Sequence, residues 1–234
     1  IRLILSLMKI TTQTSIPITR IQFPEIKLLN RDAHKLRGYF GNLFKEHSPL
    51  LHNHFADGSL RYRYPSVQYK VLAGIPTLIG IGEGASLLPT LFLEIKELKL
   101  DGIQYAINSK NIKHNQEQIG FSEELQSYRF ETLWMALNQE NHKIFIRLEN
   151  DLEKKKMLNS ILVGHVLSLF SNAGIILNAN QRLMAMTTLQ EKSTQFKGQT
   201  MLAFKGEFVI NADIPDGLGL GKSVSRGFGT VNKL

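Results

Sequence analysis

The stretch that most constrains the fold of this 234-residue chain is GLGLGKSVSRGFGTV, from Gly217 to Val231. Its five glycines fall within thirteen positions, and only Asn232, Lys233 and Leu234 follow it. A nucleotide-binding glycine loop must open a helix, because the phosphate is held at the N-terminus of that helix. Too little chain remains for such a helix, so the stretch predicts a loop that leads into a short final strand.

The glycine spacing also fails both common nucleotide motifs. The Walker A pattern G-x-x-x-x-G-K-[ST] fits Gly221-Lys222-Ser223, but its first glycine position holds Asp216. The dinucleotide pattern G-x-G-x-x-G, begun at Gly217, meets Lys222 where its third glycine should be. Closely spaced amides next to Lys222 and Arg226 could still hold phosphate groups. The alternative, which the residues leave open, is a tight turn in which the glycines serve only backbone geometry.

Composition favours a polyanionic partner. The chain has 28 Lys and Arg against 20 Asp and Glu, a formal net charge of +8 and a sequence pI near 9.6. With 43% hydrophobic residues it can bury a substantial core. The absence of cysteine excludes disulfides, thiolate metal sites and a cysteine nucleophile, and it fits a reducing compartment such as the cytoplasm.

One apolar segment, Val71–Leu93, is long enough to span a membrane but carries two prolines, four glycines and Glu83. A buried strand, a glycine turn and a short helix explain it better. The same place contains a second dinucleotide-like pattern, Gly80-x-Gly82-x-x-Ala85. Pro89 falls inside the helix that this pattern would require, which argues against it.

The order of periodic segments predicts an α+β fold with two tandem ferredoxin-like (RRM-like) β-α-β-β-α-β domains. The first half shows strands and helices at residues 1–10, 32–46, 60–72, 75–81, 85–93 and 98–112. The polar stretch 108–124 is the best candidate for a linker. In the second half the corresponding segments are 128–137, 148–171, 183–190 and 200–210, and Gly174 is placed to end the long helix. We therefore predict domains at residues 1–118 and 119–234.

The terminal loop, with this fold, resembles a known family. Written Gly219-Leu-Gly221-Lys-Ser-Val-Ser225-Arg-Gly227-Phe-Gly229, it is similar to the C-terminal signature of the CRISPR-associated endoribonucleases that cut precursor CRISPR RNA at its repeats, in the RAMP superfamily. The resemblance implies CRISPR repeat RNA as partner, and other CRISPR effector subunits as further possible partners of a monomer or homodimer. It also implies that the loop contacts RNA through Gly219, Gly221, Lys222, Ser223, Ser225, Arg226, Gly227 and Gly229.

A second block, Leu51–Val71, is similar to the branch of this family whose active-site histidines follow the first helix. The resemblance implies cleavage without metal or cofactor: the ribose 2′-hydroxyl attacks the adjacent phosphorus and leaves a cyclic phosphate and a 5′-hydroxyl. Such a reaction needs a general base and a general acid, and histidine can serve as either near neutral pH. We predict His54 as the general base and His52 as the second acid or base. Tyr62 would orient the phosphate or donate a hydrogen bond to it, and Lys45 would supply positive charge. His34, on the first helix, competes with them.

Other candidates have a structural explanation. His165 lies among apolar residues of the long helix and is expected in the core, as is Trp134, the only tryptophan. His114 and His142 fall in polar stretches and are expected at the surface. The run Lys154–Lys156 is expected to be a solvated helix face, although it could add a phosphate contact.

Three other functions compete with the nuclease. A non-catalytic RNA-binding subunit of a CRISPR effector complex would share the fold and the loop, as the resemblance implies, but would not need the histidines. A nucleotide-binding oxidoreductase would depend on the Gly80–Ala85 pattern, and a membrane protein on Val71–Leu93. Incubation with repeat RNA, titration with NAD and ATP, and solubility without detergent distinguish them.

Overall fold

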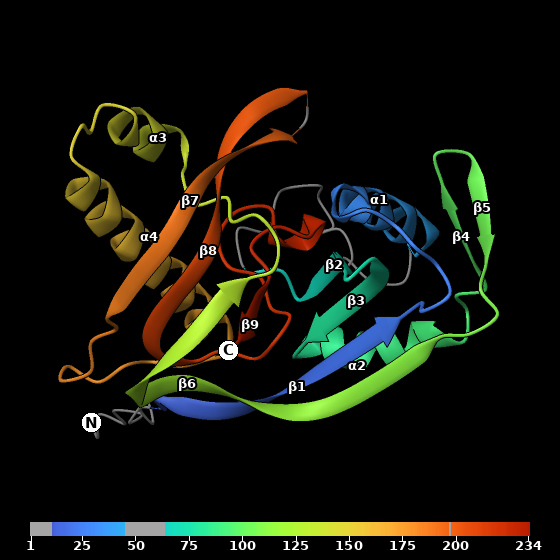
Figure 1. Cartoon of the computed structure of the whole chain (residues 1–234). Coiled ribbons are helices and arrows are strands. Elements are labelled where there is room, and N and C mark those ends of the chain that lie inside the picture. The colour runs from blue at the N-terminus through green and yellow to red at the C-terminus, as the bar shows by residue number, and fades with distance from the viewer. Residues whose placement is uncertain (1–10, 45–63, 197) are drawn as a thin grey trace, which may run out of the picture.

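The computed structural model describes residues 11–44, 64–196 and 198–234. Within these ranges the largest element is a seven-stranded antiparallel sheet (Figure 1). Six strands follow the order β2 (Val67–Leu72), β3 (Ile75–Ile81), β1 (Gln13–Gln22), β6 (Asn111–Phe130), β8 (Gln199–Asp213) and β7 (Ala185–Phe196), and β9 (Val231–Lys233) pairs with β6 beside this path. A separate two-stranded sheet, β4-β5, lies at one side. The strand expected at residues 1–10 lies outside the described residues.

The first half is a ferredoxin-like unit. Its elements in chain order are β1 (Gln13–Gln22), α1 (Ala33–Leu43), β2 (Val67–Leu72), β3 (Ile75–Ile81), α2 (Glu83–Phe92) and β6 (Asn111–Phe130). The strand order β2-β3-β1-β6 places the fourth strand of the unit beside the first, with every pair antiparallel, as this fold requires. Both helices pack on this sheet, α1 against β2 and α2 against β1 and β3.

The second half repeats the order. It uses the end of β6, then α3 (Gln139–Phe145), α4 (Asp151–Asn172), β7 (Ala185–Phe196), β8 (Gln199–Asp213) and β9 (Val231–Lys233). The strand order β9-β6-β8-β7 is again that of a ferredoxin-like unit. Between β8 and β9, where such a unit has its second helix, the chain forms the glycine-rich loop with one 3-10 turn, η3 (Val224–Arg226). The prediction of two ferredoxin-like units is confirmed, with a loop in place of the last helix.

The two units share a strand, and this overturns the predicted linker. Residues 108–124 were expected to be a linker, but most of them form β6, whose first half pairs with β1 and whose second half pairs with β8 and β9. The first half of β6 is polar because it forms an edge of the sheet and its side chains face water, which disguises it as a loop. The predicted boundary at 118 and 119 falls within β6, and the division into two domains stays a prediction.

Gly120 marks the point where β6 passes from one partner to the other. It is opposite Gln13 of β1 and also opposite Asp213 of β8, and the side chains of those two residues are joined by a hydrogen bond of 3.2 Å. The φ angle of Gly120 is +147°, and a Cβ atom at this position would lie 2.5 Å from Gln13 Cα. Only glycine allows three strands to approach so closely here.

Two further expectations for the first half are corrected. No strand was predicted over residues 13–22, which contain Pro17, but they form β1. The Pro17 carbonyl accepts from Gly82 N at the end of β3, so the side of the residue that lacks an N–H faces a strand end. The segment 98–112 was expected to be the last strand of the unit. It contains instead the hairpin of β4 (Glu97–Leu100) and β5 (Ile103–Ala106), and the role of last strand passes to β6.

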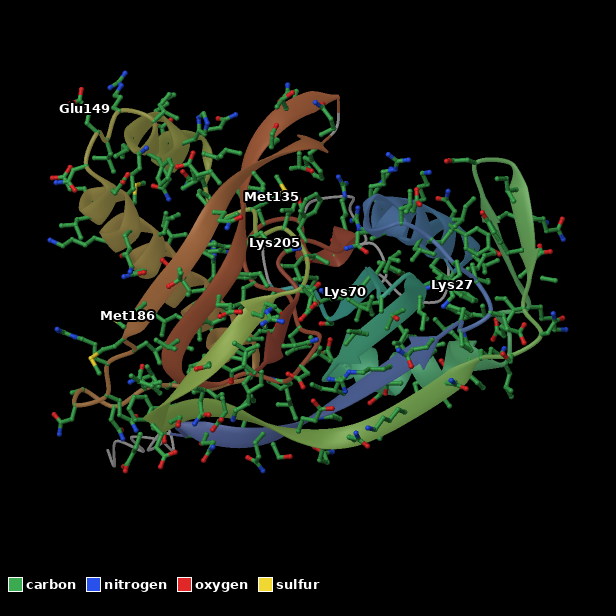
Figure 2. All side chains as sticks on the ribbon, viewed as in Figure 1. Lys27, Lys70, Met135, Glu149, Met186 and Lys205 are labelled. Atoms are coloured by element: carbon green, nitrogen blue, oxygen red, sulfur yellow. The ribbon has the colours of Figure 1, made fainter. Side chains whose placement is uncertain are left out.

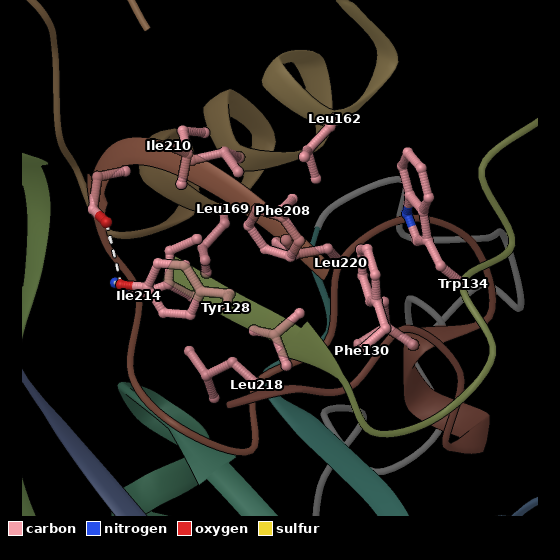
Figure 3. Close-up of a cluster of buried hydrophobic side chains, with 14 of the residues drawn as sticks. Tyr128, Phe130, Trp134, Leu162, Leu169, Phe208, Ile210, Ile214, Leu218 and Leu220 are labelled. Carbon is pink, nitrogen blue, oxygen red and sulfur yellow. Dashed lines mark hydrogen bonds between the residues drawn. The ribbon is translucent and has the colours of Figure 1, made fainter. Parts of the chain in front are cut away.

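The principal core lies between α4, the sheet and the terminal loop. Tyr128 and Phe130 of β6, Phe208 of β8 and Leu162 of α4 are buried together there (Figure 3). The predicted long helix is α4, capped at its start by the Asn150 side chain, which accepts from Leu152 N at 2.8 Å. Gly174, with φ +72°, follows its end as expected.

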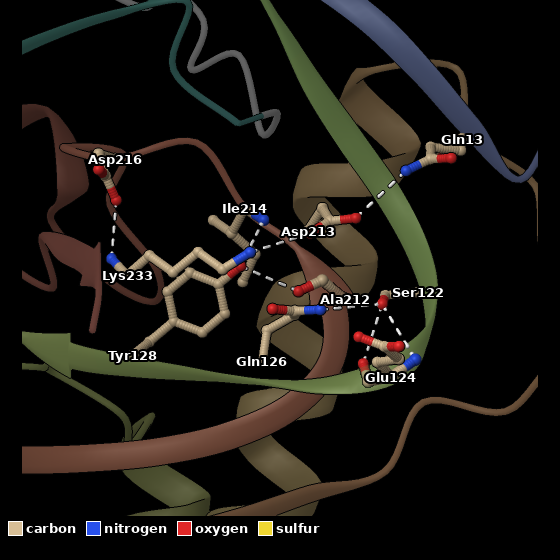
Figure 4. Close-up of polar contacts among 10 residues, drawn as sticks. All are labelled: Gln13, Ser122, Glu124, Gln126, Tyr128, Ala212, Asp213, Ile214, Asp216 and Lys233. Atoms are coloured by element: carbon tan, nitrogen blue, oxygen red, sulfur yellow. Dashed lines mark hydrogen bonds and ion pairs between the residues drawn. The ribbon is translucent and has the colours of Figure 1, made fainter.

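Polar contacts fasten the end of β8 to β6 (Figure 4). The buried hydroxyl of Tyr128 donates to Ala212 O at 3.0 Å and accepts from Ile214 N at 2.9 Å. Burial raises the pKa of Tyr128 to about 12, so the hydroxyl keeps its proton and can make both bonds. On β6 itself, the Ser122 hydroxyl accepts from Gln126 and donates to Glu124 O, which supports a bulge in the pairing with β8.

Two competing interpretations of the first half can be compared with the structure. The Gly80–Ala85 pattern does join a strand to a helix, but the sheet around it is antiparallel, and a dinucleotide fold requires parallel strands. Gly80 serves close packing, because a Cβ atom there would collide with the Gly84 carbonyl. Among the described helices, none is long and apolar enough to cross a membrane.

Candidate functional site

The terminal loop, defined here as Gly217–Thr230, lies between the two units. Three of its apolar side chains, Leu218, Leu220 and Val224, are buried in the principal core (Figure 3). Its other side touches β2 and α1 of the first unit. A loop in this position can contact a ligand that is bound by either unit, because it packs against both.

Polar side chains of the first unit hold the loop backbone. Gln68 Oε1 accepts from Gly219 N at 3.1 Å, and the Tyr64 hydroxyl donates to Gly219 O at 2.7 Å. Gln68 Nε2 in turn donates to the Tyr64 hydroxyl at 2.9 Å. Burial raises the pKa of Tyr64, so this hydroxyl remains a donor at any physiological pH. The network fixes Gly219 from both its donor and its acceptor side.

Other glycine amides of the loop are also used inside the protein. Gly229 N donates to Leu133 O at 2.8 Å, and Gly227 N donates to Val224 O at 3.1 Å. Gly227 has φ +90°, and a Cβ atom there would lie 2.6 Å from the Cβ of Ala33 on α1. The amides of Gly219, Gly227 and Gly229 therefore donate their hydrogen bonds within the protein. This is the purely geometric role of the glycines that the sequence left open as an alternative to phosphate binding.

The side chains of the loop are more available than these amides. Lys222 is exposed, and Ser223, Ser225 and Arg226 are half-buried, as is Gly221. These residues could reach a phosphate chain with cationic and hydroxyl groups. Their contact with RNA stays a prediction, as does that of Gly219, Gly227 and Gly229.

A pocket of about 690 Å³ opens beside the loop, and we call it the hairpin pocket. It is lined by residues between Asn30 and Lys35 at the start of α1, by residues 131–133, by the tip of the β7-β8 hairpin with Lys205, and by Arg226–Phe228 of the loop. In Figure 1 the hairpin extends beyond the sheet on the side where α1 and η3 lie, and Figure 2 labels Lys205 on β8. The pocket thus draws its walls from both units.

Among the described residues, His34 is the histidine that lines this pocket, and it is exposed on α1. Its Nδ1 lies 2.6 Å from the Arg31 carbonyl oxygen, which can only accept a hydrogen bond. The neutral ring therefore carries its proton on Nδ1 and keeps a free lone pair on Nε2. A histidine in this state can take a proton, so the competitor named from the sequence is placed where it could act as a base.

The charges around the pocket are mostly positive. Arg31, Lys205 and Arg226 line it as cations, and Lys35, which also lines it, forms an ion pair with Asp32 at 2.6 Å. Asp32 and Glu131 are the two acidic residues among the described residues that line the pocket. Burial, and then the positive charge of Arg226, lower the pKa of Arg37 on α1. Such a cluster attracts a polyanion.

Lys70 of β2 is a buried amine next to the terminal loop (Figure 2). Its Nζ donates to Thr230 Oγ1 at 2.8 Å. Burial lowers the pKa of Lys70 to about 7, because the charged form loses its hydration. Sequence reasoning missed this residue, since a single lysine inside an apolar strand gives no sign of where it points.

The remaining histidines and Trp134 lie mostly as expected. Trp134 is fully buried, and His165 packs edge-on against it with 5.7 Å between ring centroids. The imidazole Nδ1 of His165 and the Trp134 indole N–H are buried without a hydrogen-bond partner in the described part of the chain, so this core histidine is not satisfied. Burial, with the charge of Lys222, lowers the pKa of His165 to about 4. His114 and His142 are exposed.

The four residues predicted to catalyse, His54, His52, Tyr62 and Lys45, lie outside the described residues. The ranges that are described contain no group of three or more His, Asp or Glu side chains arranged to hold a metal ion. Among Lys154–Lys156, the last two are exposed and Lys154 approaches Glu191 at 3.9 Å, as expected for a solvated face of α4.

Both halves of the sequence match domains of one protein family. The pattern of the Cas6b N-terminal domain matches residues 14–118, and that of the Cas6b C-terminal domain matches residues 120–234. The chain belongs to the Cas6b family.

Solved Cas6b structures have the same fold. One, described as a crystal structure of Cas6b, gives a TM-score of 0.89 at 35% sequence identity, covering 94% of this chain and 100% of that one. Another, described as the CRISPR RNA processing endoribonuclease Cas6b, gives 0.77 at 32% identity with the same coverage. These values confirm the family resemblance that the loop and the two-unit order predicted.

Two further proteins extend the comparison. An uncharacterized protein of Methanocaldococcus jannaschii is 34% identical over 142 residues, which cover 60% of this Cas6b-family chain and 95% of that protein. Thermus thermophilus Cas6 has a TM-score of 0.53 at 13% identity, with 96% and 100% of the two chains covered. At that identity the likeness concerns the fold alone.

Proposed function

We propose that this chain is an endoribonuclease that cleaves precursor CRISPR RNA within its repeats and so releases guide RNAs. The observation that carries the proposal is the match of both Cas6b domains over nearly the whole chain, together with 32% identity to a structure described as a CRISPR RNA processing endoribonuclease. The formal charge of +8 and the basic pocket beside the terminal loop support an RNA substrate.

The proposed reaction needs no metal. A base removes the proton of a ribose 2′-hydroxyl, and the 2′-oxygen forms a bond to the adjacent phosphorus. The bond from phosphorus to the 5′-oxygen breaks, and an acid gives that oxygen a proton. The products are a 2′,3′-cyclic phosphate and a 5′-hydroxyl. We assign the base to His54 and the second acid or base to His52, with Tyr62 and Lys45 stabilising the phosphorane charge.

We further propose that the terminal loop contributes to RNA binding through its side chains. Lys222 and Arg226 would neutralise phosphates, and Ser223 and Ser225 would donate hydrogen bonds to phosphate oxygens. The glycines Gly219, Gly227 and Gly229 would act by keeping the backbone close to β2 and α1, so that these side chains are held in position. Gly221, half-buried beside Lys222, stays in the proposed contact set.

End-labelled repeat RNA, incubated with the protein in EDTA and run on a denaturing gel, tests the function. We expect one discrete cut in the repeat and a 5′-fragment that ends in a cyclic phosphate. A repeat with a 2′-deoxy nucleotide at the cut should stay intact, because it lacks the attacking oxygen. Cleavage that requires added divalent metal would refute the proposed chemistry.

Histidine substitutions test the assignment. His54→Ala should slow cleavage about 10²- to 10⁴-fold with nearly unchanged RNA affinity, and His52→Ala should slow it to a smaller extent. His142→Ala is the matched control, because His142 is exposed on α3. Binding of repeat RNA without any cleavage by the unaltered protein would favour the alternative, a non-catalytic RNA-binding subunit of a CRISPR effector complex.

A further inference from the structure

The hairpin pocket has the size of a nucleotide site. Its volume of about 690 Å³ falls within the range of about 300–1,000 Å³ that is typical of small-molecule sites. Its walls come from the start of α1, the hairpin tip and the terminal loop, so an occupant would touch both ferredoxin-like units at once. A segment of a larger ligand could enter while the rest follows the basic surface outside.

Two aromatic side chains form one wall of the pocket. Phe196 at the end of β7 and Phe228 of the terminal loop are both only half-buried, and their rings meet edge to face with 5.7 Å between centroids and an angle of 88°. A phenylalanine that serves the core is normally covered, as Phe204 is in the same hairpin. Half-exposed rings at the wall of a pocket are typical of proteins that stack unpaired bases.

A cation accompanies the rings. The guanidinium carbon of Arg226 lies 5.4 Å from the centroid of the Phe196 ring. Arg226 therefore offers both a plane on which a base can stack and donors for the adjoining phosphate. With Arg31 and Lys205 also lining the pocket, the site combines apolar faces with positive charge, and this matches a nucleotide within an RNA chain.

We propose that the hairpin pocket binds one unpaired nucleobase of the repeat RNA, stacked against Phe196 and Phe228, with the adjoining phosphate at Arg226. The inference rests on the proposed function, because it names how the same substrate is read. One base held in this way fixes the register of the RNA on the protein, which determines the phosphodiester that is cut.

An abasic scan tests the pocket. The substrate is a repeat RNA that cannot be cut, because it carries a 2′-deoxy nucleotide at the cleavage position. A series of these RNAs is prepared, each with one abasic nucleotide at a different position. The affinity of each RNA is measured for the unaltered protein and for Phe196→Leu. We expect one position at which the abasic change weakens binding by the unaltered protein about 5- to 100-fold, the range produced by loss of one stacked base. Phe196→Leu should bind the RNA without an abasic nucleotide more weakly by a similar factor. An abasic nucleotide at that one position should not weaken its binding further.

Leucine keeps an apolar side chain at the hairpin, so the variant should fold, and Phe121→Leu serves as control because Phe121 is a half-buried phenylalanine of β6 outside the pocket. If the unaltered protein binds and cuts the repeat but no abasic position is coupled to Phe196, the pocket inference is wrong and the nuclease proposal stands. If it does not bind repeat RNA, both are wrong.

Discussion

Lys70 and Thr230 join the two ferredoxin-like units through a buried hydrogen bond of 2.8 Å between Nζ and Oγ1. Lys70 belongs to β2 of the first unit, and Thr230 is the last residue of the terminal loop before β9. Among the described residues the printed partner of the Lys70 amine is this neutral hydroxyl, and burial disfavours the charged form of the amine. The lowered pKa of Lys70 is the consequence.

This pair predicts a pH-dependent stability. The pKa of Lys70 is lowered from 10.5 to about 7 in the folded protein, so between these values the unfolded chain binds the extra proton and stability rises with pH. Below about pH 7 the folded protein carries the full cost of a buried charge. Lys70→Met has no charge to bury, so its free energy of unfolding lacks this rise with pH. The difference in free energy of unfolding, variant minus unaltered protein, should therefore fall by about 2–4 kcal/mol from pH 7 to pH 10.

Denaturant unfolding of both proteins across this pH range measures the effect. Lys113→Met is the control, because it makes the same substitution at a lysine that is exposed on β6. A stability difference for Lys70→Met that does not change between pH 7 and pH 10 would show that Lys70 is charged in the folded protein and that its burial is compensated.

Gly227→Ala tests how closely the terminal loop must approach α1. The added Cβ atom would lie 2.6 Å from the Cβ of Ala33, at a φ angle of +90° that alanine rarely adopts. We expect a loss of about 1–3 kcal/mol in the free energy of unfolding, visible as a lower melting temperature. Gly38→Ala is the matched control: Gly38 lies inside α1 with open space around its Cα, so this change should stabilise the protein by about 0.5–1 kcal/mol.

Replacing Lys222 and Arg226 together tests the loop as a phosphate-binding element. Each phosphate contact contributes about 0.7–0.9 to the slope of log affinity against log salt, so loss of two should reduce the slope by about 1 to 2. The measurement is a series of RNA titrations at increasing salt. Lys155 and Lys156, exposed on α4, provide a control with the same change in charge. An unchanged slope in the loop variant, or an equal change in the control, would remove the loop from the RNA interface.

The sequence predicts those parts of the fold whose signals are local. The strand Ile75–Ile81 was predicted at its observed bounds, because an apolar run between two glycine turns specifies a strand without help from distant residues. The strand β6 was missed because half of it is an exposed edge, where polar side chains are the rule and the apolar alternation disappears. The strand β1 was missed because Pro17 is harmless only next to the end of β3, a tertiary fact.

In the candidate site, too, the features with a local signal could be predicted from the sequence and those that depend on tertiary contacts could not. The terminal loop was visible in the sequence because its glycine spacing is local, whereas the hairpin pocket depends on residues 34, 196 and 228 meeting in space. A signal for Phe196 did exist: an aromatic residue at the predicted turn between two strands, where polar residues are usual, indicates a surface function. Lys70 gave no such signal, because its partner Thr230 is 160 positions away.

The catalytic roles of His34 and His54 can be distinguished by a substitution of His34 that keeps its hydrogen bond to the Arg31 carbonyl. In His34→Asn the side-chain amide can still donate to the Arg31 carbonyl, as Nδ1 does now, but the basic Nε2 is lost. If His54 is the base, as proposed, cleavage by His34→Asn should stay within about tenfold of the unaltered protein, far from the 10²- to 10⁴-fold loss expected for His54→Ala. Single-turnover rates on repeat RNA over a range of pH give the comparison. A loss in His34→Asn as large as that in His54→Ala, with RNA affinity unchanged, would place the general base on α1, in the same pocket that Phe196 and Phe228 line.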